Sequence, residues 1–190
     1  MKVFFVSTPR GEGELREKYR QIYDEIPKMG YTHVSDFINT NSVGFQDKMA
    51  RGREEHKKFY HDMVKGIQSA DICIFETTMP SLGVGFLIQT ALDYSKPVIV
   101  LYYKDNTAYF LSGIEDDKLI IASYDDNNLK KVLKKTLTQA REKRDKRFNF
   151  FLSPKLLSYL EDVSNEQGVT KSKILRDLIV EHMRKRNEKS

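Results

Sequence analysis

The sequence predicts an α/β protein with a doubly wound parallel sheet of five strands, followed by a small C-terminal domain. Short apolar runs alternate with amphipathic helical stretches, a pattern that favours parallel strands with helices on both faces. The central runs lack polar alternation, which is typical of strands covered on both sides. A change of pattern and charge near residue 140 sets the expected domains at 1–140 and 146–187.

The first half of the larger domain predicts two strands and two helices. The apolar run 2–6 breaks at a Ser-Thr-Pro segment, and apolar residues then recur at helical spacing over 15–26, so a strand, a loop and a helix open the chain. A short second strand is expected at 31–34. The mostly polar stretch 41–69 carries apolar residues four apart, which indicates a helix that Gly52 interrupts.

The second half of this domain predicts three strands and two helices. Apolar runs at 71–75 and 97–103 are the third and fourth strands, and a helix at 84–94 separates them. A strand at 118–122 and a helix over 127–144 complete the domain. Ligands of such sheets bind at the carboxyl ends of the strands, so the loops after the first and third strands are expected to open on one crevice.

Composition excludes several classes of protein. With 39% hydrophobic residues in 190, the chain can bury a core. No apolar stretch approaches the ~20 residues that span a bilayer, and the start lacks a signal-peptide pattern, so we expect a cytoplasmic protein without membrane contact. The single cysteine, Cys73, lies in an apolar run and is expected to be buried. The four histidines show no ligand spacing, so we expect no metal and no cofactor.

The positive charge belongs to the C-terminal part alone. Residues 1–140 hold 19 Lys and Arg against 19 Asp and Glu, whereas residues 141–190 hold 13 against 8, which accounts for the whole net charge of +5. Such asymmetry indicates that the tail meets a polyanion. In the tail, Ser153 and Thr170 are expected to cap two helices that Gly168 separates. About 45 residues are too few for a core, so pairing with a second copy is expected.

The tail, over roughly 146–186, resembles the ribbon-helix-helix family of DNA-binding domains. The resemblance implies a homodimer whose two-stranded ribbon, from about 147 to 152, enters the major groove. Alternation along that strand turns Arg147, Asn149 and Phe151 toward DNA, and the start of the second helix would hold a phosphate. The expected DNA contacts are Arg147, Asn149, Phe151, Thr170, Lys171, Ser172 and Lys173. Phe151 stands where this family usually has a polar residue, so it either touches a thymine methyl group or packs on protein. The tail could also serve dimerisation alone.

The larger domain resembles the nucleoside 2-deoxyribosyltransferase family and its nucleotide N-glycosidase branch. The resemblance rests on Ala70-Asp71, Phe75, Pro80-Ser81-Leu82-Gly83-Val84-Gly85, Ala91 and Lys96-Pro97-Val98. It implies nucleotide-phosphate contacts from the two loops that follow the first and third strands. The residues matching those contacts are Ser7, Thr8, Arg10, Gly11, Ser81 and Gly83.

The position of the catalytic nucleophile departs from this family. The family carries a glutamate there that attacks the sugar, and this chain has Leu87. A second aspartate of the N-glycosidase branch corresponds to Met63, with Asp62 beside it. Glu76, Asp62 and Asp93 are therefore the candidate carboxylates of a rearranged site.

Two functions follow from these observations. The preferred hypothesis is a DNA-binding regulator of transcription that forms a homodimer or a higher homo-oligomer. Its larger domain would bind a nucleotide or nucleoside without catalysis, or supply further dimer contacts. The alternative is an active nucleotide or nucleoside N-glycosidase, or a deoxyribosyltransferase, with a rearranged carboxylate site. A less favoured third hypothesis is an antitoxin-like partner whose tail binds another protein.

Overall fold

The computed structural model describes residues 1–8, 13–34, 52–106, 109–144 and 150–187. The chain divides into two compact units, residues 1–146 and 147–190. Each unit is described by itself below. Arg10, Gly11, Arg147 and Asn149, all named above as candidate contacts, lie outside the described residues.

The first unit contains a parallel sheet with the strand order β2-β1-β3-β4-β5. Its strands are β1 (Lys2–Ser7), β2 (Thr32–His33), β3 (Ile72–Glu76), β4 (Val98–Tyr103) and β5 (Leu119–Tyr124). The predicted doubly wound sheet of five strands is therefore confirmed. The last strand extends two residues beyond the predicted 118–122, because its pairing with β4 continues to Tyr103 and Tyr124.

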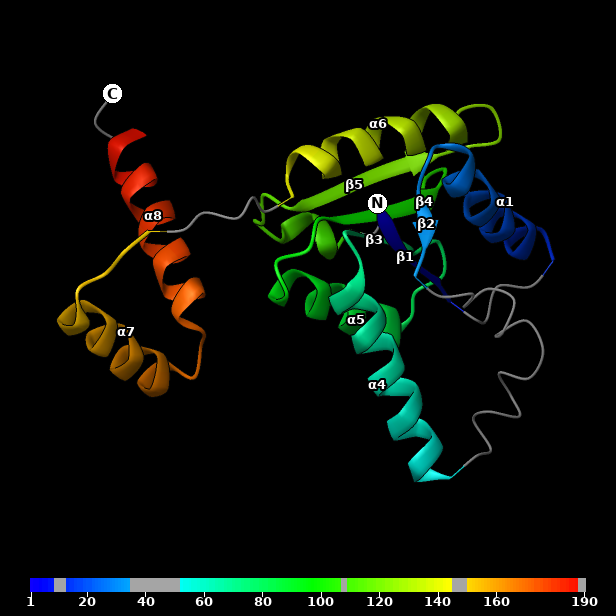
Figure 1. Cartoon of the computed structure of the whole chain (residues 1–190). Helices are drawn as coiled ribbons and strands as arrows, with labels where there is room; N and C mark the ends of the chain where they lie inside the picture. Colours follow the sequence, from blue (N-terminus) through cyan, green and yellow to red (C-terminus); the bar gives the residue numbers. More distant parts are fainter. Residues whose placement is uncertain (9–12, 35–51, 107–108, 145–149, 188–190) are drawn as a thin grey trace. The chain divides into compact units, whose positions relative to one another are not determined.

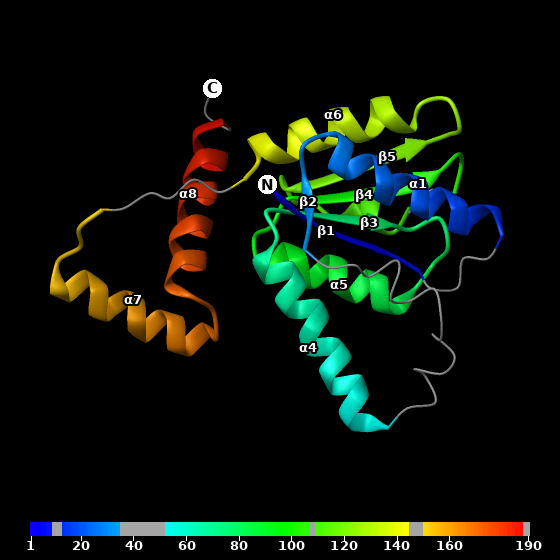
Figure 2. The ribbon, with the colours of Figure 1, turned by 45° about the vertical axis from the view of Figure 1, so that its right-hand side comes forward.

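Helices cover both faces of this sheet. Figures 1 and 2 show α1 (Glu14–Lys28) and α6 (Leu129–Glu142) on one face, and α4 (Arg53–Ser69) and α5 (Leu82–Asp93) on the other. A short 3₁₀ turn, η1 (Leu111–Gly113), follows β4. The helix predicted over 41–69 begins only at Arg53 within the described residues, because Gly52 before it has extended backbone.

Alternation along the strands divides the core into two layers. In β1, Phe5 packs in the layer of α1 and α6, whereas Phe4 packs in the layer of α4 and α5. Both phenylalanines are buried. Helix α4 approaches β1 closely at Gly66, where an added Cβ would come within 2.6 Å of the Phe4 ring.

The second unit consists of α7 (Pro154–Gln167) and α8 (Lys171–Asn187). The Ser153 side chain accepts a hydrogen bond from the Leu156 backbone N–H at 3.4 Å, and Gly168 ends α7 with φ of 64°. Leu160 and Ile174 are its buried apolar residues among those described. The large apolar residues that remain exposed include Leu156, Leu157, Tyr159, Leu178, Ile179, Val180 and Met183.

Residues 150–152 form no strand, although the sequence predicts a ribbon over 147–152. The first residues of that predicted strand, 147–149, lie outside the described residues, so the ribbon stays a prediction.

Candidate nucleotide site

The candidate site lies where the strand order changes direction, at the carboxyl ends of β1 and β3. These two strands pair in parallel, and their final residues Ser7 and Glu76 are register partners. The chain leaves β1 toward one edge of the sheet and β3 toward the other. In doubly wound sheets this switch point is where ligands bind.

Both polar residues predicted at the end of β1 are buried. Ser7 is the last residue of the strand, and Thr8 follows it at 2% exposure. The predicted contacts Arg10 and Gly11 fall on the undescribed part of the next loop. Ser7 and Thr8 therefore stand at the correct edge of the sheet for the predicted phosphate contact.

The second predicted loop leads into the first turn of α5. The Ser81 side chain caps this helix by accepting a hydrogen bond from the Val84 backbone N–H at 3.5 Å. Gly83 lies exposed in the first turn, and a Cβ built there would have as its nearest neighbour the Ser81 Oγ at 3.9 Å. Unpaired N–H groups and the helix dipole favour an anion at such a helix start.

The two positions at which the resemblance implies carboxylates are apolar and buried. Leu87 on α5 is 8% exposed and Met63 on α4 is 6% exposed, and both belong to the core layer between these helices and the sheet. Phe86, next to Leu87, is half exposed and lies 6.1 Å from the Tyr60 ring, centroid to centroid. Positions 63 and 87 therefore contribute apolar side chains to the core, and the exposed neighbour Phe86 is aromatic.

Asp62 and Asp93 are exposed, and they lie at different distances from the site. Asp62 precedes Met63 on α4. Asp93 ends α5 and accepts a hydrogen bond from the Gln89 side chain at 3.0 Å. Because a helix rises 1.5 Å per residue, Asp93 lies about 16 Å along the axis from Leu82, away from the strands' carboxyl ends.

Glu76 is fully buried and held by several hydrogen bonds. Its carboxylate accepts hydrogen bonds from the Tyr124 hydroxyl at 3.0 Å, from the Thr78 backbone N–H at 3.3 Å and from the Thr78 hydroxyl. Tyr124 belongs to the core layer of α1 and α6. Phe75 faces the opposite layer, so the sheet separates Glu76 from Leu87.

Burial raises the pKa of Glu76 to about 7, against the lowering effect of the hydrogen bonds from Thr78 and Tyr124. The same environment raises the pKa of Tyr124, first through burial and then through the charge of Glu76. Burial and Glu76 raise the pKa of Tyr19 on α1 in the same way. A carboxyl group that titrates near neutral pH is suited to acid and base chemistry, but here its oxygens are already used by the protein.

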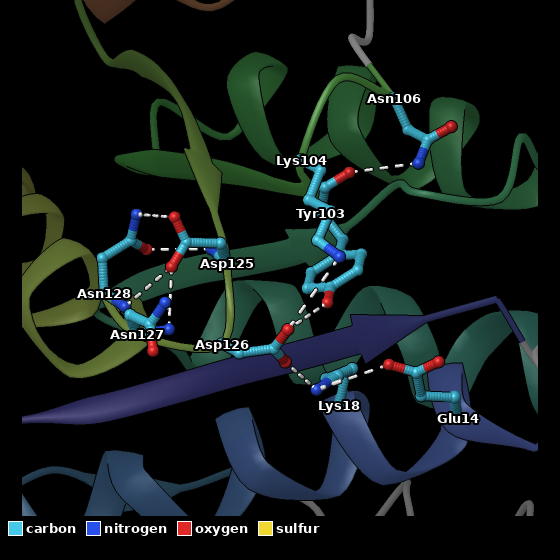
Figure 3. A network of polar contacts seen from close by, with 9 residues as sticks. All are labelled: Glu14, Lys18, Tyr103, Lys104, Asn106, Asp125, Asp126, Asn127 and Asn128. Carbon is cyan, nitrogen blue, oxygen red and sulfur yellow. Dashed lines mark hydrogen bonds and ion pairs between the residues drawn. The ribbon is translucent and has the colours of Figure 1, made fainter.

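A second polar network lies at the ends of β4 and β5, as Figure 3 shows. The Tyr103 hydroxyl donates to one Asp126 oxygen at 2.5 Å, and the Lys18 ammonium binds the other. The Lys18 hydrogen bond lowers the pKa of Asp126, with the Tyr103 hydroxyl as the next cause. The neighbouring Asp125 side chain accepts hydrogen bonds from the backbone N–H groups of Asn127 and Asn128, just before α6.

The predicted DNA contacts that are described lie on two parts of the second unit. The Phe151 side chain is fully exposed. The Thr170 side chain accepts a hydrogen bond from the Lys173 backbone N–H at 3.2 Å, and so caps α8 as predicted. Lys171 pairs with Glu161 at 3.3 Å, Lys173 pairs with Asp177 at 3.3 Å, and Ser172 is exposed. These four residues from 170 to 173 gather at one helix start.

Sequence reasoning missed the tyrosines around Glu76 and the Asp126 network. In the sequence, Tyr103 ends an apolar run, Tyr19 belongs to a helical stripe, and Tyr124 falls beyond the strand predicted at 118–122. The one available signal was their common place, since each polar tip falls at the carboxyl edge of the sheet. Among the described residues, no group of three or more histidine, cysteine, aspartate or glutamate side chains could hold a metal ion. No described helix is long and apolar enough to cross a membrane.

Comparison with known proteins identifies the family. The chain is 30% identical over 134 residues to a Methanosarcina barkeri protein named as a 2′-deoxynucleoside 5′-phosphate N-hydrolase; the match covers 70% of this chain and 82% of that protein. This chain belongs to the 2′-deoxynucleoside 5′-phosphate N-hydrolase family. Another N-hydrolase, the 5-hydroxymethyl-dUMP N-hydrolase of Tetraodon nigroviridis, is 24% identical over 138 residues, which is 70% of this chain and 94% of that protein.

One solved structure similar to this chain is a CMP N-glycosidase from Clostridium botulinum. It is 17% identical, with a TM-score of 0.45, and the match covers 73% of this chain and 99% of that chain. No protein-family model matches the chain.

Proposed function

We propose that the first unit binds a 2′-deoxynucleoside 5′-monophosphate at the carboxyl ends of β1 and β3. The observation that carries this proposal is the meeting of Ser7, Thr8 and the Ser81-capped start of α5 at the switch point of the sheet. Family membership supports it, because relatives are named for their action on deoxynucleotides.

Calorimetric titration with dUMP, dCMP, dAMP and dGMP tests nucleotide binding. We expect at least one to bind, with loss of about tenfold or more in affinity in an Arg10→Ala variant, because arginine makes charge-assisted hydrogen bonds to phosphate. An Arg20→Ala variant, which changes an exposed residue of α1, serves as the matched control. Binding of the nucleosides as tightly as of the monophosphates would contradict a phosphate site.

Hydrolysis of the N-glycosidic bond is the second candidate function, and family membership favours it. The reaction needs a carboxylate at the sugar and a second group that assists the leaving base. Position 87 supplies no carboxylate, because it is a leucine, and Glu76 faces the core layer on the opposite side of the sheet. Asp62 is the candidate on the side of Leu87, because it is exposed on α4 beside Met63.

Chromatography of free base after incubation with the same monophosphates tests hydrolysis. Base release that disappears in Asp62→Asn and persists in Asp93→Asn would establish a rearranged site. Release by Leu87→Glu alone would assign the wild-type chain to nucleotide binding without cleavage, the function that the apolar residues at positions 63 and 87 favour.

We further propose that the second unit binds duplex DNA as a homodimer and makes the protein a transcriptional regulator. The whole excess of positive charge lies in residues 141–190, which contain this unit and the segment before it, and this supports the proposal. The helix faces of the unit support it too, because they expose apolar residues such as Leu178 and Ile179. Fluorescence anisotropy with a labelled duplex should show an affinity that falls about 100-fold or more between 50 and 200 mM salt. Arg147→Ala should weaken it, whereas Lys155→Ala should not. Affinity that ignores salt would overturn the proposal.

A further inference from the structure

Tyr103, the last residue of β4, contacts the loop that follows β3. Its backbone N–H donates to the Thr78 side-chain oxygen at 2.8 Å, and the Thr78 hydroxyl donates to Glu76. The neighbouring Thr77 N–H donates to the Leu101 carbonyl oxygen at 2.8 Å. The first two residues of the loop that ends at Ser81 are therefore fixed to the end of β4.

The side chain of the same tyrosine reaches the start of α1. Its hydroxyl donates to Asp126, which also binds Lys18, and the Lys18 ammonium lies 3.8 Å from the Glu14 carboxylate in the first helical turn (Figure 3). Helix α1 follows the loop after β1. One residue thus links the start of α1 to the loop that precedes α5.

Burial of its two ends supports this link. Tyr103 is 8% exposed and the Lys18 side chain 12%, whereas the Asp126 carboxylate that joins them is about half exposed. The Lys18 and Lys104 ammonium groups lie 5.3 and 4.6 Å from the centre of the Tyr103 ring. Lys104 adopts a left-handed backbone conformation with φ of 53°, which is unfavourable for a non-glycine residue.

We propose that Tyr103 is a positioning residue for nucleotide binding: it holds α1 and the β3–α5 loop in a fixed relation, so that Thr8 at the end of β1 and the Ser81-capped start of α5 can contact one 5′-phosphate group. This inference rests on the proposed nucleotide site. A phosphate accepts hydrogen bonds over a narrow distance range, so donors on two separate loops must be fixed relative to each other before binding. The Tyr103 main chain contacts the β3–α5 loop at Thr78, and its hydroxyl is linked through Asp126 to Lys18 of α1.

Tyr103→Phe tests the link, because it removes the hydroxyl and keeps the ring and the backbone. Tyr102→Phe is the matched control, since Tyr102 is the preceding strand residue and lies outside the network. The affinities of dUMP, dCMP, dAMP, dGMP and the four matching nucleosides are measured by calorimetry. We expect the dissociation constant of the bound monophosphate to rise about tenfold in Tyr103→Phe, with the nucleoside unchanged.

Amide hydrogen exchange without ligand provides a second readout. Exchange of residues 77–83 and 14–18 should rise together in Tyr103→Phe and stay unchanged in Tyr102→Phe. The double variant Tyr103→Phe with Asp126→Asn should be no weaker in monophosphate affinity than the worse single variant, because both remove the same link.

The outcomes separate this inference from the proposed function. Wild-type protein that binds no monophosphate overturns both. Wild-type protein that binds monophosphate, with Tyr103→Phe binding it equally well, overturns the positioning role and leaves the site. Equal loss for the nucleotide and its nucleoside also overturns it, because a general structural defect acts on both.

Discussion

Replacing Glu76 by glutamine should change how stability depends on pH. Glu76 is fully buried and its pKa is raised from 4.5 to about 7. The folded chain therefore holds this proton more tightly than the unfolded chain. The stability that the protonated group contributes is fully present below pH 4.5 and is lost as the pH rises through 7.

The size of this effect follows from the shift. A difference of about 2.5 between the two pKa values corresponds to about 3 kcal/mol, most of it lost between pH 5 and pH 8. Glutamine has the same shape and no titration, so this dependence disappears in the variant. The difference in unfolding free energy, wild type minus Glu76→Gln, should fall by about that amount over this range.

Urea denaturation of the full chain, followed by circular dichroism at pH 5, 6, 7 and 8, measures this difference. The contribution of the second unit is the same in both proteins and cancels. Glu115→Gln, at an exposed position, serves as the control and should give a constant difference. Parallel curves for wild type and Glu76→Gln would refute the argument that burial controls this carboxyl group.

Two further substitutions test the packing. Gly66→Ala should destabilise the chain by about 1–3 kcal/mol in thermal or urea unfolding, because its Cβ would come within 2.6 Å of the buried Phe4 ring. Gly85→Ala is the control, since nothing lies within 4 Å of a Cβ built there. A smaller loss of stability in Gly66→Ala than in Gly85→Ala would contradict this close packing. Leu178→Glu should convert the expected dimer to a monomer in sedimentation velocity, because it charges an apolar position that is 54% exposed in the single chain. Unchanged sedimentation would exclude this helix face from the dimer contact, and Arg184→Glu is the charge control.

The sheet was predictable because its strands have a simple physical signature. The central strands are covered on both faces, so their residues are apolar without alternation, as in Ile72 to Phe75. The same property concealed which side of the sheet Glu76 faces. Only the contacts with Tyr124 and Thr78 settle that, and they join residues up to 48 positions apart.

The candidate site was predictable in part. Ser81 was named as a phosphate contact because its loop resembles the family's second loop, and the structure places it as the N-cap of α5. The link from Thr78 through Tyr103 and Asp126 to Lys18 was missed, because it joins four separate segments and uses ordinary residue types. The ribbon over 147–152 stays a prediction, because a strand at a chain's edge forms only beside a partner strand.

The position of Glu76 and Leu87 on opposite sides of the sheet has a consequence for how this chain can change. The hydrogen bonds that support the loops belong to the α1 and α6 layer, whereas positions 63 and 87 belong to the other. Mutations at positions 63 and 87 can add or remove reactive groups while the hydrogen bonds that support the loops stay intact. The supporting contacts and positions 63 and 87 can therefore vary independently in this domain, because no core layer contains both.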